Sequence, residues 1–191
     1  MFPQGNVKGA IGKDTRQAYG AQEKQSRGRT RMQIGLITKV DIPQWRALSS
    51  EYDCYVKESV SGLSEWYGGN DYSPAFISYM HAKIAQQEAF MTVDRDDTCL
   101  GIIAFSKKNN RITFFAVSHH ADFSVVANAL FDCTFAHLDI SKAIYINEII
   151  SSSDWMGLHK KLYLDLGFAF YCDSIENGVP VKTFEKAPQS V

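Results

Sequence analysis

The order in which helical and strand-like segments alternate is the feature that most constrains how this chain can fold. Apolar residues recur every three to four positions in some segments, and they alternate or run together in others, which indicates helices and strands respectively. From residue 34 to residue 184 the order is β-α-α-β-β-β-α-β-α-β-β. This order predicts a mixed α/β sheet, mostly antiparallel, with helices on both faces.

Turn and capping residues set the segment boundaries. Strands are predicted at 34–40, 90–94, 99–106, 111–117, 143–150, 168–175 and 179–184. The short turns between 90 and 117 predict an antiparallel meander, and Glu-Asn-Gly at 176–178 predicts a hairpin turn. A D-x-x-Q run at 41–44 and Ser73-Pro74 each predict a helix start.

Each expected helix has one apolar face. The inner positions are predicted to be Trp45, Leu48, Tyr52 and Val56 in the first helix, and Phe76, Ile77, Met80 and Ile84 in the second. In the third, from 122 to 138, they are Phe123, Val126, Ala127, Leu130 and Thr134. In the fourth they are Trp155, Leu158, Leu162 and Leu166, and Gly167 ends that helix.

Charge is concentrated at the N-terminus, although the formal net charge is only −1. Residues 1–31 contain seven Lys and Arg against two acidic residues, and the other 160 residues contain 13 basic and 19 acidic groups. We expect 1–31 to be a flexible basic arm or leader, 32–187 to be the folded domain, and 188–191 to be a tail. Alternatively the arm contacts nucleic acid or another anionic surface.

Composition excludes several protein classes. With 45% hydrophobic and 13% aromatic residues the chain is too apolar to be disordered. It contains no apolar run long enough for a membrane span and no secretory signal, so we expect a cytoplasmic protein without a membrane partner. The four cysteines are scattered without a C-x-x-C pair, and the histidines lack ligand spacing, so no metal site is predicted.

Two local sequences resemble those of a known enzyme superfamily. The run LYLDLGF at 162–168 resembles the Y-x-x-x-G-F signature of the GNAT superfamily of N-acetyltransferases. Residues 116–130 align without a gap to its acetyl-CoA motif, A-V-x-x-x-x-(Q/R)-x-x-G-x-(G/A)-x-x-L. The resemblance covers about residues 32–187 and implies the GNAT fold, with acetyl-CoA as co-substrate.

The second motif is degenerate. Asp122 replaces the family's Gln or Arg, and Val125 replaces its first glycine, whereas Ala127 fits the last small position. In the family, backbone N–H groups at a helix N-terminus bind the pyrophosphate, where Asp122 would instead cap the helix and repel the anion. The cofactor-binding positions implied by the resemblance are Phe115, Ala116, Val117, His119, His120, Asp122, Phe123, Ser124, Val125 and Ala127.

The resemblance also implies the catalytic residues. An amine would attack the thioester directly, and Tyr163 would protonate the departing thiolate; the alternative is a tyrosine of the core. Glu148 is our candidate base, because it shares a strand face with Ile144 and Ile146, where an acid is unusual. The alternative for Glu148 is a glutamate at the exposed end of the strand.

A Gly-rich loop supplies the candidate substrate residues, Trp66, Tyr67, Asp71 and Tyr72. Aromatic rings with a carboxylate can hold a cation, so a primary amine of a small molecule or peptide is expected as acceptor. The chain therefore resembles an acetyl-CoA-dependent N-acetyltransferase. The alternative is a catalytically inactive ligand-binding or regulatory module of the same fold. We expect no nucleic-acid partner, and a homodimer is open.

Overall fold

A computed structural model describes residues 32–56, 74–150, 154–176 and 179–189. The strands are β1 (Gln33–Leu36), β2 (Ala89–Val93), β3 (Cys99–Ser106), β4 (Arg111–Val117), β5 (Ile144–Ile149), β6 (Phe168–Glu176) and β7 (Val179–Lys186). The helices are α1 (Ile42–Val56), α3 (Pro74–Ala85), α4 (Phe123–Phe135) and α5 (Asp154–Asp165), with a 3-10 turn at Lys39–Asp41. The predicted element order is confirmed. The basic arm, the 68–71 loop and Ser73 lie outside the described residues.

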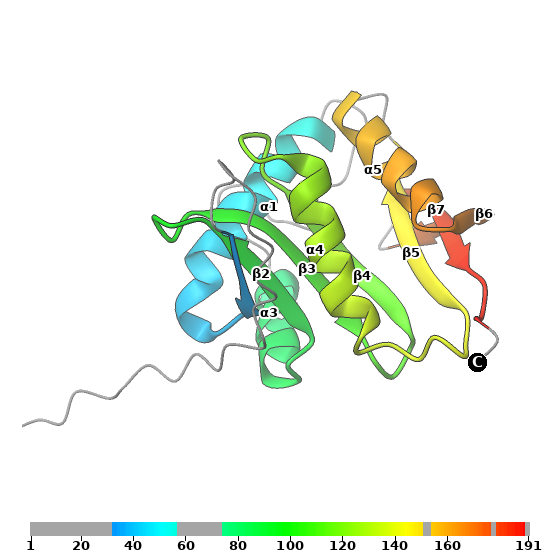
Figure 1. The fold of residues 1–191 in the computed structure, drawn as a ribbon, viewed down its shortest axis with the longest axis horizontal. Coiled ribbons are helices and arrows are strands. Elements are labelled where there is room, and N and C mark those ends of the chain that lie inside the picture. Colours follow the sequence, from blue (N-terminus) through cyan, green and yellow to red (C-terminus); the bar gives the residue numbers. More distant parts are fainter. Residues whose placement is uncertain (1–31, 57–73, 151–153, 177–178, 190–191) are drawn as a thin grey trace, which may run out of the picture.

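The strands form one seven-stranded sheet in the order β1-β2-β3-β4-β5-β7-β6. Every neighbouring pair is antiparallel except β4 and β5, which are parallel. Helices α1 and α3 pack on one face, and α4 and α5 lie on the other (Figure 1). The mixed, mostly antiparallel sheet with helices on both faces is therefore confirmed. None of the described helices combines the length and hydropathy needed to cross a membrane.

Each face of the sheet has its own apolar core. Trp45 and Met80 are fully buried on the α1–α3 side, and Leu130 and Phe131 are fully buried on the α4–α5 side. Helix α4 lies so close to β3 that a Cβ atom at Gly101 would sit 2.6 Å from Val126 Cγ1. Gly101 therefore allows this close approach of helix and sheet.

Two helix faces differ from the prediction. Ile77 is 37% exposed and Leu158 is 40% exposed, although both were expected to point inward. In α5 Leu162 is buried as predicted, and Met156, His159 and Tyr163 are buried as well, so the inner face extends one position beyond the predicted leucine stripe.

The first strand is shorter than predicted, because the chain turns at Thr38. The Asp41 carboxylate accepts hydrogen bonds from Thr38 N (2.9 Å) and Thr38 Oγ1 (2.8 Å). Asp41 thus closes the 3-10 turn that precedes α1, instead of capping α1 through the predicted D-x-x-Q run. By contrast, the predicted end of α5 is confirmed, since Gly167 has a φ of +84°.

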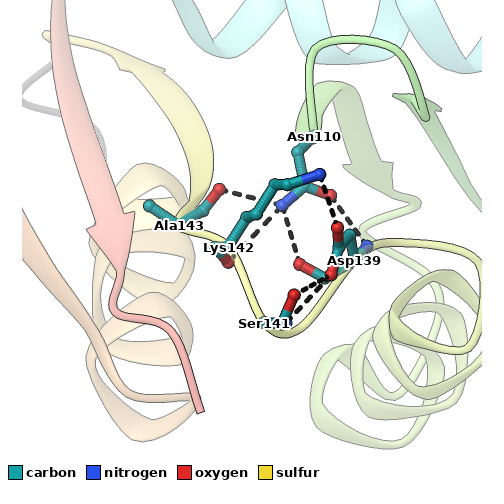
Figure 2. Close-up of polar contacts among 5 residues, drawn as sticks. All are labelled: Asn110, Asp139, Ser141, Lys142 and Ala143. Atoms are coloured by element: carbon teal, nitrogen blue, oxygen red, sulfur yellow. Dashed lines mark hydrogen bonds and ion pairs between the residues drawn. The ribbon is translucent and has the colours of Figure 1, made fainter. Parts of the chain in front are cut away.

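Asn110 fixes the junction between β4 and β5 (Figure 2). Its Nδ2 donates to the carbonyls of Asp139 and Ala143, both at 2.9 Å, and its Oδ1 accepts from Asp139 N at 2.9 Å. The Asn110 carbonyl also accepts from Tyr145 N at 3.3 Å. One side chain therefore ties the turn before β4 to the loop before β5, so that the two parallel strands begin side by side.

Candidate functional site

Strands β4 and β5 separate soon after they start. They pair only at Arg111 with Tyr145 and Ile112 with Ile146. Beyond these pairs a cavity of about 80 Å³ lies between them, lined mainly by β4 and β5 with Tyr52 from α1, Tyr163 from α5 and Glu176 from β6. This opening between two parallel strands exposes the edge of β4 to a ligand, so we take it as the centre of the candidate site.

Glu148 lies on β5 beside this opening. It is 8% exposed and shares its face with the buried Ile144 and Ile146, as predicted. Burial raises the pKa of its carboxyl from 4.5 to about 7, although Lys160 and Lys182 oppose the rise. A carboxyl with a pKa near 7 can accept a proton at neutral pH, which is the property that a general base needs.

Tyr163 forms part of the cavity wall. It is 2% exposed and packs against Phe115, Phe168 and Phe184. Burial raises the pKa of its phenol well above 10, and the nearby Tyr52 and Glu148 raise it further. The phenol therefore carries its proton at neutral pH, as a proton donor must.

Two further residues of this region were missed by the sequence analysis as functional candidates. Tyr52 lines the cavity, and burial together with Glu148 raises the pKa of its phenol. His159, one helical turn before Tyr163, is 1% exposed. Its ring centroid lies 4.9 Å from that of Phe115 and 6.0 Å from that of Tyr52.

The imidazole of His159 is neutral and unpaired within the part of the chain that the structure describes. Burial lowers its pKa to about 3, and neither ring nitrogen has a hydrogen-bond partner among the described residues. A buried polar group without a partner is costly and therefore uncommon in proteins. The spacing of Met156, His159 and Tyr163 in α5 could have placed this histidine on the inner face.

The loop between β4 and α4 holds most of the expected cofactor residues. Asp122 caps α4, because its Oδ1 accepts from Val125 N at 3.1 Å. Glu51, a residue of α1 that the sequence analysis did not identify, reaches the same loop: its Oε1 accepts from His119 N at 2.6 Å, and its Oε2 accepts from Ser118 Oγ at 3.2 Å.

The other expected cofactor residues are divided between core and surface. Phe115, Ala116, Val117 and Ala127 are buried, and Phe123 is partly buried against Phe115 and His159. Ser124, Val125, His119 and His120 are exposed. Ala127 packs within the core between α4 and the sheet, so its small size serves helix packing.

The edge of β4 and the N-terminus of α4 differ in how well they suit coenzyme A. Beyond Ile112 the backbone of β4 does not pair with β5, and this edge is where the resemblance implies a pantetheine arm. The α4 N-terminus does not fit a diphosphate, because Glu51 and Asp122 already accept the N–H groups of His119 and Val125 and bring negative charge.

A second hollow of about 420 Å³ lies over β5, β7 and β6, on the face of the sheet opposite α5. Hydrogen bonds connect its polar side chains: Ser174 Oγ with Thr183 Oγ1 at 2.9 Å, Thr183 Oγ1 to Asn147 Oδ1 at 2.9 Å, and Asn147 Nδ2 to Glu176 Oε2 at 2.7 Å. Asn147 and Glu176 also line the β4–β5 cavity, so the two hollows adjoin. The predicted substrate residues Trp66, Tyr67, Asp71 and Tyr72 lie outside the described residues.

Comparison with known proteins finds solved structures with a similar architecture. No family model matches the sequence, and no curated protein matches it. A GNAT-family acetyltransferase from Staphylococcus aureus Mu50 is 11% identical with a TM-score of 0.60, over 83% of this chain and 100% of that one. The Salmonella typhimurium protein yncA, solved with its cofactor acetyl-CoA, is 11% identical with a TM-score of 0.56, over 84% and 95%.

A third solved structure is the ribosomal-protein-S18-alanine N-acetyltransferase from Escherichia coli. It is 9% identical with a TM-score of 0.58, and the match covers 84% of this chain and 96% of that one. Identities this low show likeness of fold alone. The order of elements, the mixed sheet and these neighbours together assign the GNAT fold to this chain, as the resemblance at residues 116–130 and 162–168 predicted.

Proposed function

We propose that this protein transfers an acetyl group from acetyl-CoA, through its thioester, to a primary amine of a small molecule or peptide. The observation that carries the proposal is the pair of groups beside the β4–β5 opening. Tyr163 is a buried phenol that carries its proton at neutral pH, and Glu148 has a pKa of about 7. An acid and a base with these properties are what direct aminolysis of a thioester needs.

The residues would act as follows. Glu148 accepts a proton from the ammonium form of the acceptor, directly or through water. The free amine nitrogen then attacks the thioester carbonyl carbon, so that a C–N bond forms and the C–S bond breaks. Tyr163 donates its proton to the departing sulfur, and the remaining amine proton leaves to solvent. Tyr163 is then reprotonated from solvent and Glu148 releases its proton to solvent, which completes the cycle without an oxidant or reductant.

We assign the acceptor to the polar hollow over β5 and β6. It adjoins the thioester end of the site through Asn147 and Glu176, and its volume is within the range of ligand pockets. The Glu176 carboxylate is half exposed and lies 3.9 Å from the Arg111 guanidinium, and we propose that a cationic amine shares this carboxylate. The loop residues Trp66, Tyr67, Asp71 and Tyr72 remain part of this proposal as further acceptor contacts.

Calorimetric titration of the full chain with acetyl-CoA, with desulfo-CoA as a control, tests donor binding. Thiol release is then measured with a panel of primary amines for the wild type, Tyr163→Phe and Glu148→Gln. We expect turnover to fall about 100-fold or more in each variant while donor affinity changes less than about twofold. Tyr171→Phe, at an exposed tyrosine of β6, is the matched control and should keep its turnover.

The alternative function is a ligand-binding or regulatory module that has lost catalysis. The carboxylates at the α4 N-terminus are the observation that favours it. Donor binding without thiol release for any amine would support this alternative. Turnover in the wild type that Tyr163→Phe leaves intact would contradict the role proposed for Tyr163.

A further inference from the structure

Four backbone N–H groups of the β4–α4 loop and the first turn of α4 are already hydrogen-bonded inside the protein. His119 N donates to Glu51 Oε1 at 2.6 Å, and Val125 N donates to Asp122 Oδ1 at 3.1 Å. Ala121 N donates to the Ser118 carbonyl at 3.0 Å, and His120 N lies 3.4 Å from Ser118 Oγ. An anion that uses the N–H groups of His119 and Val125 would therefore have to displace a carboxylate from each.

Charge and shape oppose a diphosphate in the same place. Glu51 and Asp122 each bring a carboxylate to the loop, although Glu51 Oε1 also lies 2.5 Å from His119 Nδ1. Each unit negative charge at a distance of about 4 Å weakens anion binding by about fivefold or more. Val125 is 37% exposed, and its branched side chain stands where close backbone approach to a phosphate would be needed. The loop thus contains residues that disfavour binding of a nucleotide diphosphate.

The β4–β5 opening, by contrast, has polar groups beside it that match an amide. The ring of His159 packs against three side chains of the cavity wall, Tyr52, Phe115 and Tyr163. Its two ring nitrogens are buried without a partner among the described residues. A neutral imidazole offers one N–H donor and one nitrogen acceptor, and an amide offers the complementary acceptor and donor. A pantetheine arm contains two amides, whereas a diphosphate contains only acceptors.

We infer that this chain recognises its acyl donor by the pantetheine arm and not by a nucleotide diphosphate, so that a pantetheine thioester without the nucleotide is a sufficient donor. The inference rests on the proposed acetyl transfer and narrows its donor class. His159 is assigned as a hydrogen-bonding residue for an amide of the arm. The thioester is then carried either on coenzyme A or on the phosphopantetheine arm of a carrier protein.

The first experiment compares donors. The full chain is titrated by calorimetry with acetyl-CoA and with S-acetylpantetheine, in the absence of an amine. We expect the two dissociation constants to agree within about threefold, whereas two charge-assisted hydrogen bonds to a diphosphate would give acetyl-CoA an advantage of about 100-fold. An advantage of that size overturns the inference but leaves the proposed function in place. Binding of neither thioester overturns both.

An acetylated carrier protein is the third donor in this comparison. A dissociation constant below that of acetyl-CoA supports the inference and identifies the protein-bound thioester as the source. Equal constants also support it and identify the free thioester. The inference is overturned if the carrier protein fails to bind and acetyl-CoA binds about 100-fold tighter than S-acetylpantetheine.

The second experiment removes the obstacles at α4. Asp122→Asn removes the charge but keeps a helix cap, Asp122→Gly also frees Val125 N, and Glu51→Gln removes the second charge. We expect affinity for acetyl-CoA to rise about fivefold or more along this series, with affinity for S-acetylpantetheine unchanged within about twofold. Asp132→Asn, an exposed carboxylate farther along α4, is the control. Equal gains for both donors, or no gain for acetyl-CoA, would contradict the inference.

The third experiment tests His159. His159→Phe keeps an aromatic ring of similar size and removes both nitrogens, so the variant is expected to fold and to gain stability in denaturant. Its affinity for acetyl-CoA and for S-acetylpantetheine should fall by about fivefold each, the worth of one hydrogen bond. A gain in stability without loss of affinity for either donor assigns His159 to the core and overturns its role.

Discussion

The raised pKa of Glu148 predicts how the stability of this protein depends on pH. A carboxyl whose pKa is higher in the folded than in the unfolded state stabilises the fold at low pH. That contribution is complete below the unfolded pKa and is lost as pH rises through the folded pKa. For Glu148 the window therefore runs from about 4.5 to about 7. In Glu148→Gln the side chain at this position cannot ionise, so the unfolding free energy of the variant should not fall for this reason across the window.

The size of the effect follows from the pKa. A rise from 4.5 to about 7 corresponds to about 3.4 kcal/mol at about 1.36 kcal/mol per pH unit. Solvent screens part of the charge, so we expect about 2 kcal/mol. The difference in unfolding free energy, Glu148→Gln minus wild type, should therefore grow by about 2 kcal/mol as pH rises from about 5 to about 8.

Urea denaturation at several pH values measures this difference. Asp165→Asn, an exposed carboxylate at the end of α5, controls for the general effect of losing one negative charge. A difference that stays constant across the pH range, or that shrinks as pH rises, would refute the reasoning. A growing difference that Asp165→Asn reproduces would assign the effect to net charge instead of to burial of Glu148.

Three other substitutions test contacts that hold the site in place, and the unfolding free energy of each variant is measured by urea denaturation. Gly101→Ala should cost about 1–3 kcal/mol, because the new methyl group meets Val126; unchanged stability would contradict the close packing of α4 on β3. Asn110→Ala should cost about 2–3 kcal/mol, because backbone groups of the α4–β5 loop lose their partners and the φ of +48° favours asparagine. Lys83→Met should cost about 3–5 kcal/mol by leaving Glu88 buried without its 2.9 Å ion pair. The double variant Lys83→Met/Glu88→Met should recover most of that loss, and a double variant no more stable than the single one would argue against the pairing.

The fold could be predicted because its signals are local. Hydrophobic periodicity and turn residues gave the element order, and the short turns around β3 gave the meander. The errors arose where tertiary packing decided the outcome. Leu158 is apolar yet exposed, whereas His159 is polar yet buried, because α5 faces aromatic rings of β4 and α4. Periodicity counts apolar residues and therefore missed a histidine on the inner face.

The site could be predicted only in part. Glu148 became a candidate because an acid on a buried strand face breaks the alternating pattern, and Tyr163 became a candidate through the Y-x-x-x-G-F run. The structure shows that both are buried. The cap formed by Asp122 was also foreseen, and it is confirmed. Glu51 gave no signal, because its role depends on the contact between α1 and a loop that follows 67 residues later. The separation of β4 from β5 likewise appears only in the strand pairing.

We propose that a buried carboxyl and a protonated phenol beside the β4–β5 opening support transfer of an acetyl group to an amine. Thiol release by the full chain from saturating acetyl-CoA, with an amine found active in the panel, is measured as a function of pH. We expect a rate that rises with pH to a plateau, with an apparent pKa near 7 that Glu148→Gln abolishes. A rate that keeps the same pH dependence in Glu148→Gln, or no thiol release at any pH, would contradict it.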